Sequence, residues 1–174
     1  MERPVLLCGL GRVGWRVFDS LRAAGLTVAV IDSHLDPSDS RLVGVRAVKG
    51  DCRLPDVLEQ AGVKDARGVL ILTSDDLVNI STALLVRRLN AEVRVVVRMF
   101  NQNLIARFAG AVKNTVAMSV SALVAPVMAL TAVSGDTLAR SSWTTARGRF
   151  PNWSRRTAPI WSASGSRTSR ANTA

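Results

Sequence analysis

A glycine-rich turn lies between a predicted strand and a predicted helix near the start of the chain. Residues 9–14 read Gly-Leu-Gly-Arg-Val-Gly, directly after the apolar run 5–8 and directly before a helical pattern. Asp32 ends the next apolar run, 23 residues after Gly9, close to the spacing of about 20 residues typical of an acid that holds an adenosine ribose. Because a strand precedes the turn, a helix follows it and an acid lies near the expected spacing, we favour a pyrophosphate-binding turn over a glycine-rich turn without a ligand.

The three glycines of this turn have different physical roles. Gly9 permits the tight turn, Gly11 allows the backbone to approach a pyrophosphate, and Gly14 lets the helix pack close to the strand. The first N–H groups of the helix have no partner within it, and the helix dipole adds a partial positive charge there. This helix N-terminus is therefore expected to stabilise a phosphate.

Strands and helices alternate regularly over residues 3–135, which we expect to form one domain. Strands are predicted at 5–8, 27–31, 47–48, 68–72, 94–97 and 115–117, and helices at 12–24, 55–61, from 76 onward, at 101–109 and at 120–132. This alternation is typical of a doubly wound, Rossmann-like α/β fold, with a parallel sheet and helices on both faces. In the third helix, the spacing of Leu77, Ile80 and Leu84 predicts that these side chains point inward, with Val78 and Leu85 as further candidates.

The predicted topology gathers polar residues at one edge of the sheet. Right-handed crossovers place the glycine turn, Asp32, Asp51, Thr73 and Arg98 at the carboxyl ends of the strands. Asp75 and Asp76 follow Thr73 and are explained by capping of the next helix and compensation of its dipole. We identify no metal constellation and no pair of nucleophile and base.

The net charge of +10 is concentrated at the C-terminal end. Residues 1–136 carry 16 Lys and Arg against 13 Asp and Glu, whereas residues 137–174 carry seven Arg and no acid. Because 136–174 are rich in Ser, Thr, Arg and Pro without periodicity, we predict a disordered basic tail. The alternatives are a segment that binds nucleic acid or a membrane through its tryptophans, and a truncated or frame-disrupted coding end. We expect no nucleic-acid partner for the domain itself.

The sequence indicates a cytoplasmic protein. Cys8 and Cys52 are the two cysteines, and neither belongs to a C-x-x-C pair or to a disulfide framework. The first predicted strand begins at Val5, which leaves no room for a signal peptide. No apolar stretch reaches the roughly 20 residues of a membrane span.

Several motifs together resemble those of a known family. They are similar to those of the nucleotide-binding domain that regulates potassium conductance, called the RCK N-terminal or Trk-type KTN domain. The motifs are the turn 9–14, Asp32, the block from Gly50-Asp51 to Ala61-Gly62-Val63, the run 69–76 with Asn79, and the strand 95–98. The block 50–63 is the more specific part, since many dinucleotide-binding proteins share the glycine turn. The resemblance covers roughly residues 4–135.

The resemblance implies a cytosolic sensor that is not an enzyme. Members bind NAD(H), ATP, ADP or related nucleotides and gate potassium channels, transporters or antiporters. It implies that the turn 9–14 holds phosphates, that Asp32 holds the adenine ribose, and that Asp51 and Cys52 line the adenine pocket. The cofactor-binding set implied for this chain is Gly9, Gly11, Arg12, Val13, Gly14, Asp32, Ser33, Asp51, Cys52, Thr73, Ser74 and Arg98.

Two arginines of this set have ordinary alternatives. Arg12 and Arg98 match basic positions that reach the outer phosphate in some members, and a guanidinium suits phosphate oxygens. Arg12 is equally explained as a solvated arginine in the first helical turn, and Arg98 as part of a surface ion pair. The small ligand-binding domain that usually follows in the family is not recognisable in residues 136–174, and the sequence contains no pore or transporter segment. If the sequence is the whole protein, the expected channel or transporter subunit is a separate chain; if it is a fragment, the sequence does not establish this coupling.

The alternative function is the cofactor domain of an NAD-dependent oxidoreductase that lacks its substrate domain. The chain has no tyrosine, and its one histidine, His34, lies two residues after the predicted ribose acid. A general acid for hydride transfer belongs beside the nicotinamide. We therefore interpret His34 as a loop residue near the adenine and predict no catalytic residues.

The last predicted helix is apolar nearly all round. Val120, Leu123, Val124, Val127, Met128 and Leu130 lie on it with hardly any charge. Such a helix is buried in a core or against a partner. The resemblance implies that it crosses to a second copy, and we predict a homodimer or a larger ring. In the alternatives, the helix completes the core of the monomer or packs on a missing part of the chain.

Overall fold

A computed structural model of the chain describes residues 3–134. The predicted basic tail 136–174 and the predicted domain end at residue 135 lie outside the described residues. The strands are β1 (Val5–Cys8), β2 (Val28–Asp32), β3 (Arg46–Lys49), β4 (Gly68–Ile71), β5 (Arg94–Arg98) and β6 (Thr115–Met118). The α-helices are α1 (Arg12–Ala23), α2 (Pro55–Gln60), α3 (Asp76–Leu89), α4 (Gln102–Ala111) and α5 (Val120–Ser134), with short 3₁₀ turns at Ser40–Leu42 and Val63–Asp65.

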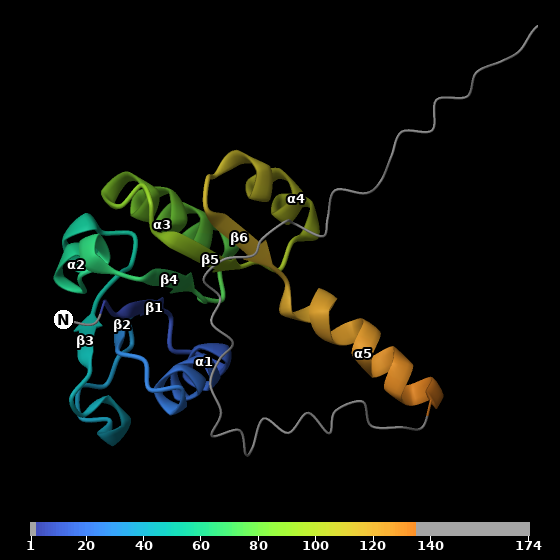
Figure 1. Ribbon diagram of the computed structural model, residues 1–174, viewed down its shortest axis with the longest axis horizontal. Helices are drawn as coiled ribbons and strands as arrows, with labels where there is room; N and C mark the ends of the chain where they lie inside the picture. The colour runs from blue at the N-terminus through green and yellow to red at the C-terminus, as the bar shows by residue number, and fades with distance from the viewer. Residues whose placement is uncertain (1–2, 135–174) are drawn as a thin grey trace, which may run out of the picture. The chain divides into compact units, whose positions relative to one another are not determined.

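The six strands form one parallel sheet in the order β3-β2-β1-β4-β5-β6. This order confirms the predicted doubly wound, Rossmann-like fold. The chain moves outward from β1 to β3 and then returns to the other side of β1 with β4 (Figure 1). Loops that follow β1 and β4 therefore diverge and leave a crevice at the carboxyl edge of the sheet, where ligands bind in folds of this type.

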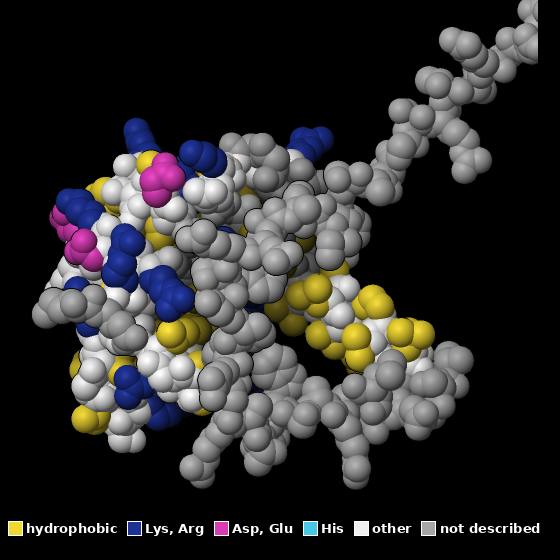
Figure 2. All heavy atoms as spheres, in the orientation of Figure 1, with side chains coloured by type: hydrophobic (Ala, Val, Ile, Leu, Met, Phe, Trp, Pro, Cys, Tyr) yellow, Lys and Arg dark blue, Asp and Glu magenta, His cyan; other side chains and the backbone are white. Residues whose placement is uncertain are grey.

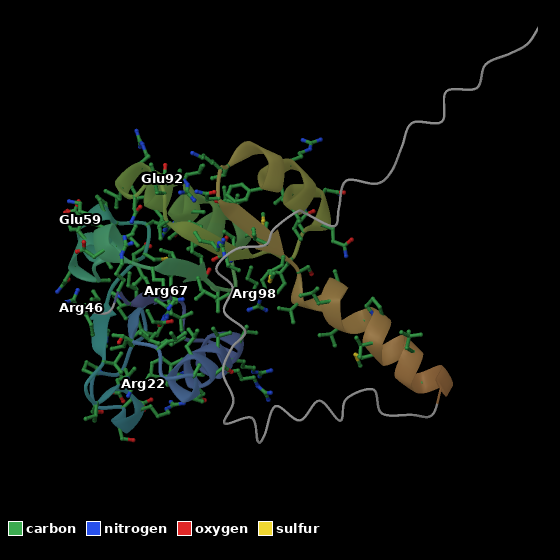
Figure 3. All side chains as sticks on the ribbon, viewed as in Figure 1. Arg22, Arg46, Glu59, Arg67, Glu92 and Arg98 are labelled. Atoms are coloured by element: carbon green, nitrogen blue, oxygen red, sulfur yellow. The ribbon has the colours of Figure 1, made fainter. Side chains whose placement is uncertain are left out.

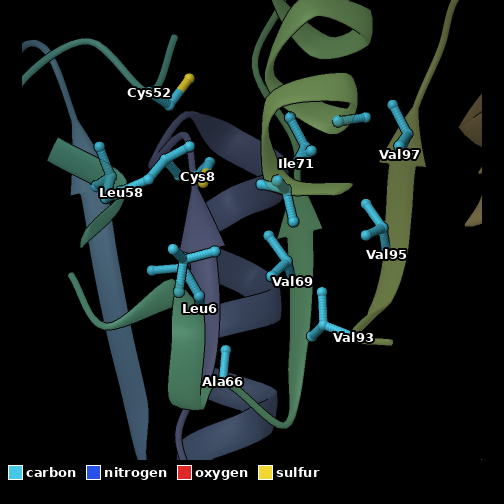
Figure 4. Packing of buried hydrophobic residues seen from close by; sticks show 14 of the residues in the cluster. Leu6, Cys8, Cys52, Leu58, Ala66, Val69, Ile71, Val93, Val95 and Val97 are labelled. Carbon is cyan, nitrogen blue, oxygen red and sulfur yellow. The ribbon is translucent and has the colours of Figure 1, made fainter. Parts of the chain in front are cut away.

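Helices cover the sheet on two sides. One core cluster joins alternate residues of the central strands, such as Leu6, Val69 and Val95, to α2, α3 and α4 (Figure 4). A second cluster on the other face joins Leu7 and Val30 to α1. Since successive strand residues point to opposite faces, the continuous apolar runs predicted for the central strands match burial on both sides.

The predicted inward face of α3 is wrong for Leu77 and Leu84 and right for the other three residues. Leu77 is 72% exposed and Leu84 is 47% exposed, while Val78, Ile80 and Leu85 are half-buried against the core. The buried stripe consists instead of Asn79, Thr82, Ala83 and Val86. These side chains are mostly small or polar, which lets α3 approach the sheet closely, and hydrogen bonds of the buried Asn79 amide fix the rotation of the helix.

The edge strand β6 and the helix that follows it expose apolar side chains. Val116 and Met118 of β6 are 47% and 38% exposed. The helix that follows, α5, also exposes apolar side chains, among them Leu123 at 59% and Val124 at 45% (Figure 2). No helix within residues 3–134 is long and apolar enough to cross a membrane.

Candidate functional site

A cavity of about 840 Å³ opens at the carboxyl edge of the sheet. Its wall contains eleven of the twelve residues that the sequence implied for a cofactor: Gly9, Gly11, Arg12, Val13, Asp32, Ser33, Asp51, Cys52, Thr73, Ser74 and Arg98. The twelfth, Gly14, is buried in the first turns of α1 and does not line the cavity. The structure thus brings the candidate residues together, and their role in binding stays a prediction.

The three glycines of the turn differ in what surrounds them. Gly9 has φ +97°, and a Cβ there would lie 2.9 Å from the backbone nitrogen of Thr73. A Cβ on Gly14 would lie 2.0 Å from the carbonyl oxygen of Gly9. A Cβ on Gly11 would meet nothing within 4 Å. The fold therefore requires Gly9 and Gly14, whereas only a ligand would require the open space beside Gly11.

Asp32, at the end of β2, ties two loops together. Its Oδ2 accepts a hydrogen bond from the backbone N–H of Leu10 at 2.7 Å, and its Oδ1 accepts one from the N–H of His34 at 2.7 Å. These bonds hold the carboxylate between the glycine turn and the loop after β2. Each carboxylate oxygen has a second lone pair, so the group can still accept hydrogen bonds from two neighbouring hydroxyls.

The N-terminus of α1 is a positively polarised part of the wall. α1 begins at Arg12 without a side-chain cap and without an acidic residue in its first turn. By contrast, Asp75 caps α3 by accepting from the N–H groups of Leu77 and Val78 at 2.8 and 3.1 Å. The N–H groups of the first turn of α1 are therefore placed to bind an anion.

Arg98 brings a second guanidinium to the cavity from the end of β5 (Figure 3). Its Cζ lies 4.3 Å from the centre of the Phe100 ring, a cation–π contact that orients the side chain. Within residues 3–134 it forms no ion pair with a carboxylate, unlike the surface pair considered as its alternative role. Arg12 and Arg98 therefore both present positive charge to the cavity.

The loop after β3 supplies another part of the wall. The Asp51 carboxylate pairs with the guanidinium of Arg53, with an N–O distance of 2.6 Å. The hydrogen bonds from Arg53 lower the pKa of Asp51. Asp51 therefore reaches the cavity as half of an ion pair, and Arg53, which the sequence did not single out, lines the cavity with it.

Sequence reasoning also missed a small cluster beside the first turn of α1. The Cζ of Arg41 lies 3.5 Å from the centre of the Trp15 ring, and hydrogen bonds from Arg41 lower the pKa of Asp39. All three residues line the cavity, with Leu35 and Leu42 beside them. The close spacing of Asp39 and Arg41 is compatible with a local turn, but nothing in the sequence pairs Arg41 with Trp15.

Asn79 of α3 joins the ends of β4 and β5 beneath the cavity. Its Nδ2 donates to the carbonyl oxygens of Thr73 and Arg98 at 3.2 and 2.9 Å, and its Oδ1 accepts from the Thr73 hydroxyl at 2.6 Å. The side chain is fully buried. Asn79 therefore holds two wall residues in place without facing the cavity itself.

The model of the TrkA-N domain family matches residues 5–119. The chain belongs to this family. Among curated relatives of this TrkA-N domain, a Trk system potassium uptake protein TrkA homolog of Pyrococcus abyssi is 30% identical over 97 residues, which cover 55% of this chain and 43% of the relative. The TrkA protein of Streptomyces coelicolor is 33% identical over 101 residues, which cover 56% and 44%. The chain thus spans less than half the length of these relatives.

Solved structures share the fold of the TrkA-N domain. The TrkA-N domain of the inner membrane protein ybaL from Escherichia coli aligns with a TM-score of 0.64 and 21% identity, over 74% of this chain and 96% of that one. The GsuK channel bound to NAD aligns with a TM-score of 0.67 and 23% identity, over 77% and 24%. The Kef C-terminal domain of Shewanella denitrificans, in an AMP-bound form, aligns with a TM-score of 0.63 and 20% identity, over 78% and 83%.

Proposed function

We propose that this TrkA-N domain senses nucleotides for a potassium channel or transporter, and that it binds NAD(H) or an adenine nucleotide such as ATP or ADP without catalysis. The observation that carries this proposal is the cavity at the carboxyl edge, which places the Asp32 carboxylate near the uncapped N-terminus of α1. An adenosine phosphate has two ribose hydroxyls and an anionic group, and the cavity offers a partner to each.

The ligand is proposed to lie across the switch point of the sheet. Phosphates contact the turn 9–14 and the first turn of α1, and the ribose hydroxyls donate to Asp32. The adenine packs against the loop of Asp51 and Cys52, while Arg12 and Arg98 reach the outer phosphate. The NAD and AMP ligands of structures with the same fold support this class of ligand.

The proposed partners are the membrane subunit of a potassium channel or transporter and a second copy of this chain. The names of the curated relatives, which concern potassium uptake, support a potassium channel or transporter as the membrane partner. This assignment places the domain in the cytoplasm, at the inner face of the membrane. Ligand binding transmits a signal only if it favours one arrangement of the two copies over another.

Isothermal titration of the 174-residue chain against NAD, NADH, ATP, ADP and NADP tests the proposal. We expect saturable binding of at least one of the first four. NADP is expected to bind more weakly than NAD, because its 2′-phosphate would face the Asp32 carboxylate. Absence of binding by all five nucleotides, or a clear preference for NADP, would overturn the assignment.

The oxidoreductase alternative makes a different prediction for the bound cofactor. A cofactor domain positions the nicotinamide for hydride transfer to a substrate, so NAD(H) must bind better than ATP and ADP. A sensor for adenine nucleotides has no such requirement, and binding of ATP or ADP with affinity similar to that of NADH would favour it.

A further inference from the structure

Basic residues stand where the strands of the sheet begin. Arg46 and Arg94 are the first residues of β3 and β5, Arg67 directly precedes β4, and Arg3 and Lys113 come two residues before β1 and β6. All five residues are exposed. Because all six strands are parallel, these residues lie along one edge of the sheet, and the nucleotide cavity lies at the other edge (Figure 3).

Most of this positive charge is not neutralised by a neighbouring acid. Lys113 lies 3.7 Å from the Glu92 carboxylate. The ion pairs of the described residues include none of the other four, Arg3, Arg46, Arg67 and Arg94, which we name the basic edge. Arg3 donates from its Nε to the backbone carbonyl of Asp65 at 3.3 Å, so the charge of Asp65 offsets at most one of the four arginines.

Compensation of helix dipoles does not explain the basic edge. Arg22 and Arg88 stand in the last turns of α1 and α3, where a positive charge stabilises the helix. The arginines of the basic edge instead begin strands or directly precede them. Arg67 and Arg94 also lie on neighbouring strands, since Arg94 pairs with Gly68, and the strands are about 4.8 Å apart. Like charges at this spacing repel each other, and an anionic partner would relieve the repulsion.

We propose that the basic edge binds an anionic phospholipid surface. From β3 to β5 it covers four strand spacings, or about 19 Å, and this row of arginines complements a planar surface of negative headgroups. The choice of lipid rests on the proposed function, which places the domain at the inner face of a membrane. In this orientation the nucleotide cavity faces away from the lipid and stays accessible.

A nucleic acid is the competing anionic partner. Proteins that bind single strands stack the bases on aromatic side chains. Within residues 3–134, the aromatic side chains lie at the cavity edge of the sheet or in the core, and they are Trp15, Phe18, Phe100 and Phe108. The basic edge therefore offers no stacking platform, and duplex DNA is the nucleic acid that the experiment must compare with lipid.

Vesicle co-sedimentation of the 174-residue chain without nucleotide tests the surface. We expect binding to phosphatidylcholine vesicles with about one third phosphatidylserine, weak binding to phosphatidylcholine alone, and release at high salt. In the double variant Arg67→Glu with Arg94→Glu, we expect the affinity for anionic vesicles to fall about tenfold or more. The matched control, Arg16→Glu with Arg107→Glu, changes the net charge equally at exposed positions within α1 and α4 and is expected to lose much less affinity.

Equal binding of anionic vesicles by the two double variants would overturn the proposal. The seven Arg of residues 137–174 are the same in both variants, so binding through that segment alone gives this result. Equal binding to anionic and neutral vesicles would also overturn it. Circular dichroism checks the folding of each variant, and glutamine replaces glutamate at the same positions where a variant unfolds.

Fluorescence anisotropy with a duplex DNA oligonucleotide supplies the comparison with nucleic acid. We expect weaker binding to DNA than to anionic vesicles. Tighter binding to DNA that is lost in Arg67→Glu with Arg94→Glu would assign the basic edge to nucleic acid and overturn the lipid proposal.

Titration calorimetry of the same variant separates this proposal from the proposed function. We expect wild-type affinity for NAD or ADP, because the basic edge and the cavity lie at opposite edges of the sheet. Nucleotide binding by a chain whose vesicle binding ignores the basic edge would overturn the lipid surface alone. Vesicle binding through the basic edge by a chain that binds no nucleotide would overturn the proposed function and leave the surface standing.

Discussion

Asp32 combines a structural and a proposed binding role in one carboxylate. It accepts the N–H groups of Leu10 and His34, and so connects the glycine turn to the loop after β2. A ribose would add hydrogen bonds to a group that is already oriented. The cavity therefore needs little rearrangement at this residue on binding, because the protein itself holds the acceptor in place.

We predict that Asp32→Ala binds NAD or ADP about ten- to hundredfold more weakly than wild type, since hydrogen bonds to a charged group contribute about 1.5–3 kcal/mol. The free energy of unfolding also falls, because the N–H groups of Leu10 and His34 lose their acceptor. Titration calorimetry and urea denaturation measure the two effects. Glu92→Ala, which removes an exposed carboxylate far along the sequence, serves as the control and is expected to leave the affinity unchanged.

The fold requires Gly9 and Gly14 of the turn, whereas only a bound ligand would require Gly11. We predict that Gly11→Val keeps the wild-type melting temperature but strongly weakens nucleotide binding, because its side chain enters space that is open only without ligand. Gly14→Ala is expected to lower stability by about 1–3 kcal/mol, since its Cβ would overlap the Gly9 carbonyl. Thermal melts and calorimetry on both variants check this, and undiminished affinity in folded Gly11→Val would contradict the phosphate position.

At the scale of elements, α3 shows how polar contacts decide which face of a helix is buried. Asn79 donates to carbonyl oxygens at the ends of β4 and β5, and Asp76 accepts from the backbone N–H groups of Phe100 and Asn101 at 2.9 Å each. These contacts leave Leu77 on the outside. The first turn of α3 thus organises the cavity edge as well as its own N-terminus.

We predict that Val86→Ala lowers the free energy of unfolding by about 2–3 kcal/mol, because Val86 is fully buried. Leu77→Ala removes a larger but exposed side chain and is expected to change stability by less than about 0.5 kcal/mol. Chemical denaturation of the two variants compares them directly. A larger loss of stability for Leu77→Ala than for Val86→Ala would contradict this orientation of α3 and support the one that the apolar spacing alone predicts.

At the scale of the whole molecule, two exposed apolar surfaces occur close together in the sequence. Val116 and Met118 lie on one face of β6, and α5 follows two residues later with exposed Leu123 and Val124. A soluble domain rarely leaves large apolar surfaces exposed without a partner. A second copy of this chain supplies two matching surfaces, and this supports the proposed dimer.

We predict that the 174-residue chain, of 18.7 kDa, elutes as a dimer in size-exclusion chromatography with light scattering at micromolar concentration. Leu123→Lys places a charge on the apolar surface of α5 and is expected to shift the mass toward the monomer. Ser121→Lys adds the same charge at an exposed polar position of the helix and is expected to leave the dimer intact. A monomeric wild-type chain that is folded by circular dichroism would exclude the dimer.

The local sequence determines the order of elements and the turn that the cavity is built on. The central strands are continuous apolar runs because both sides of a parallel strand are buried, and Gly9 and Gly14 are required by backbone contacts within a few residues or between adjacent strands. Asp32, Thr73 and Arg98 were predictable at one edge of the sheet because Asp32 and Arg98 end parallel strands and Thr73 follows β4 by two residues, and parallel strands place their carboxyl ends at one edge.

Only the tertiary structure decides which side chains of different segments meet. The reason is that no local sequence pattern specifies how two segments are rotated relative to one another. The apolar spacing of α3 favours Leu77 and Leu84, yet the hydrogen bonds of Asn79 with Thr73 and Arg98 turn these leucines outward. The contact of Arg41 with Trp15 likewise joins side chains from different elements. Such contacts depend on how the loops close over the sheet, a property of the packed molecule rather than of any one stretch of sequence.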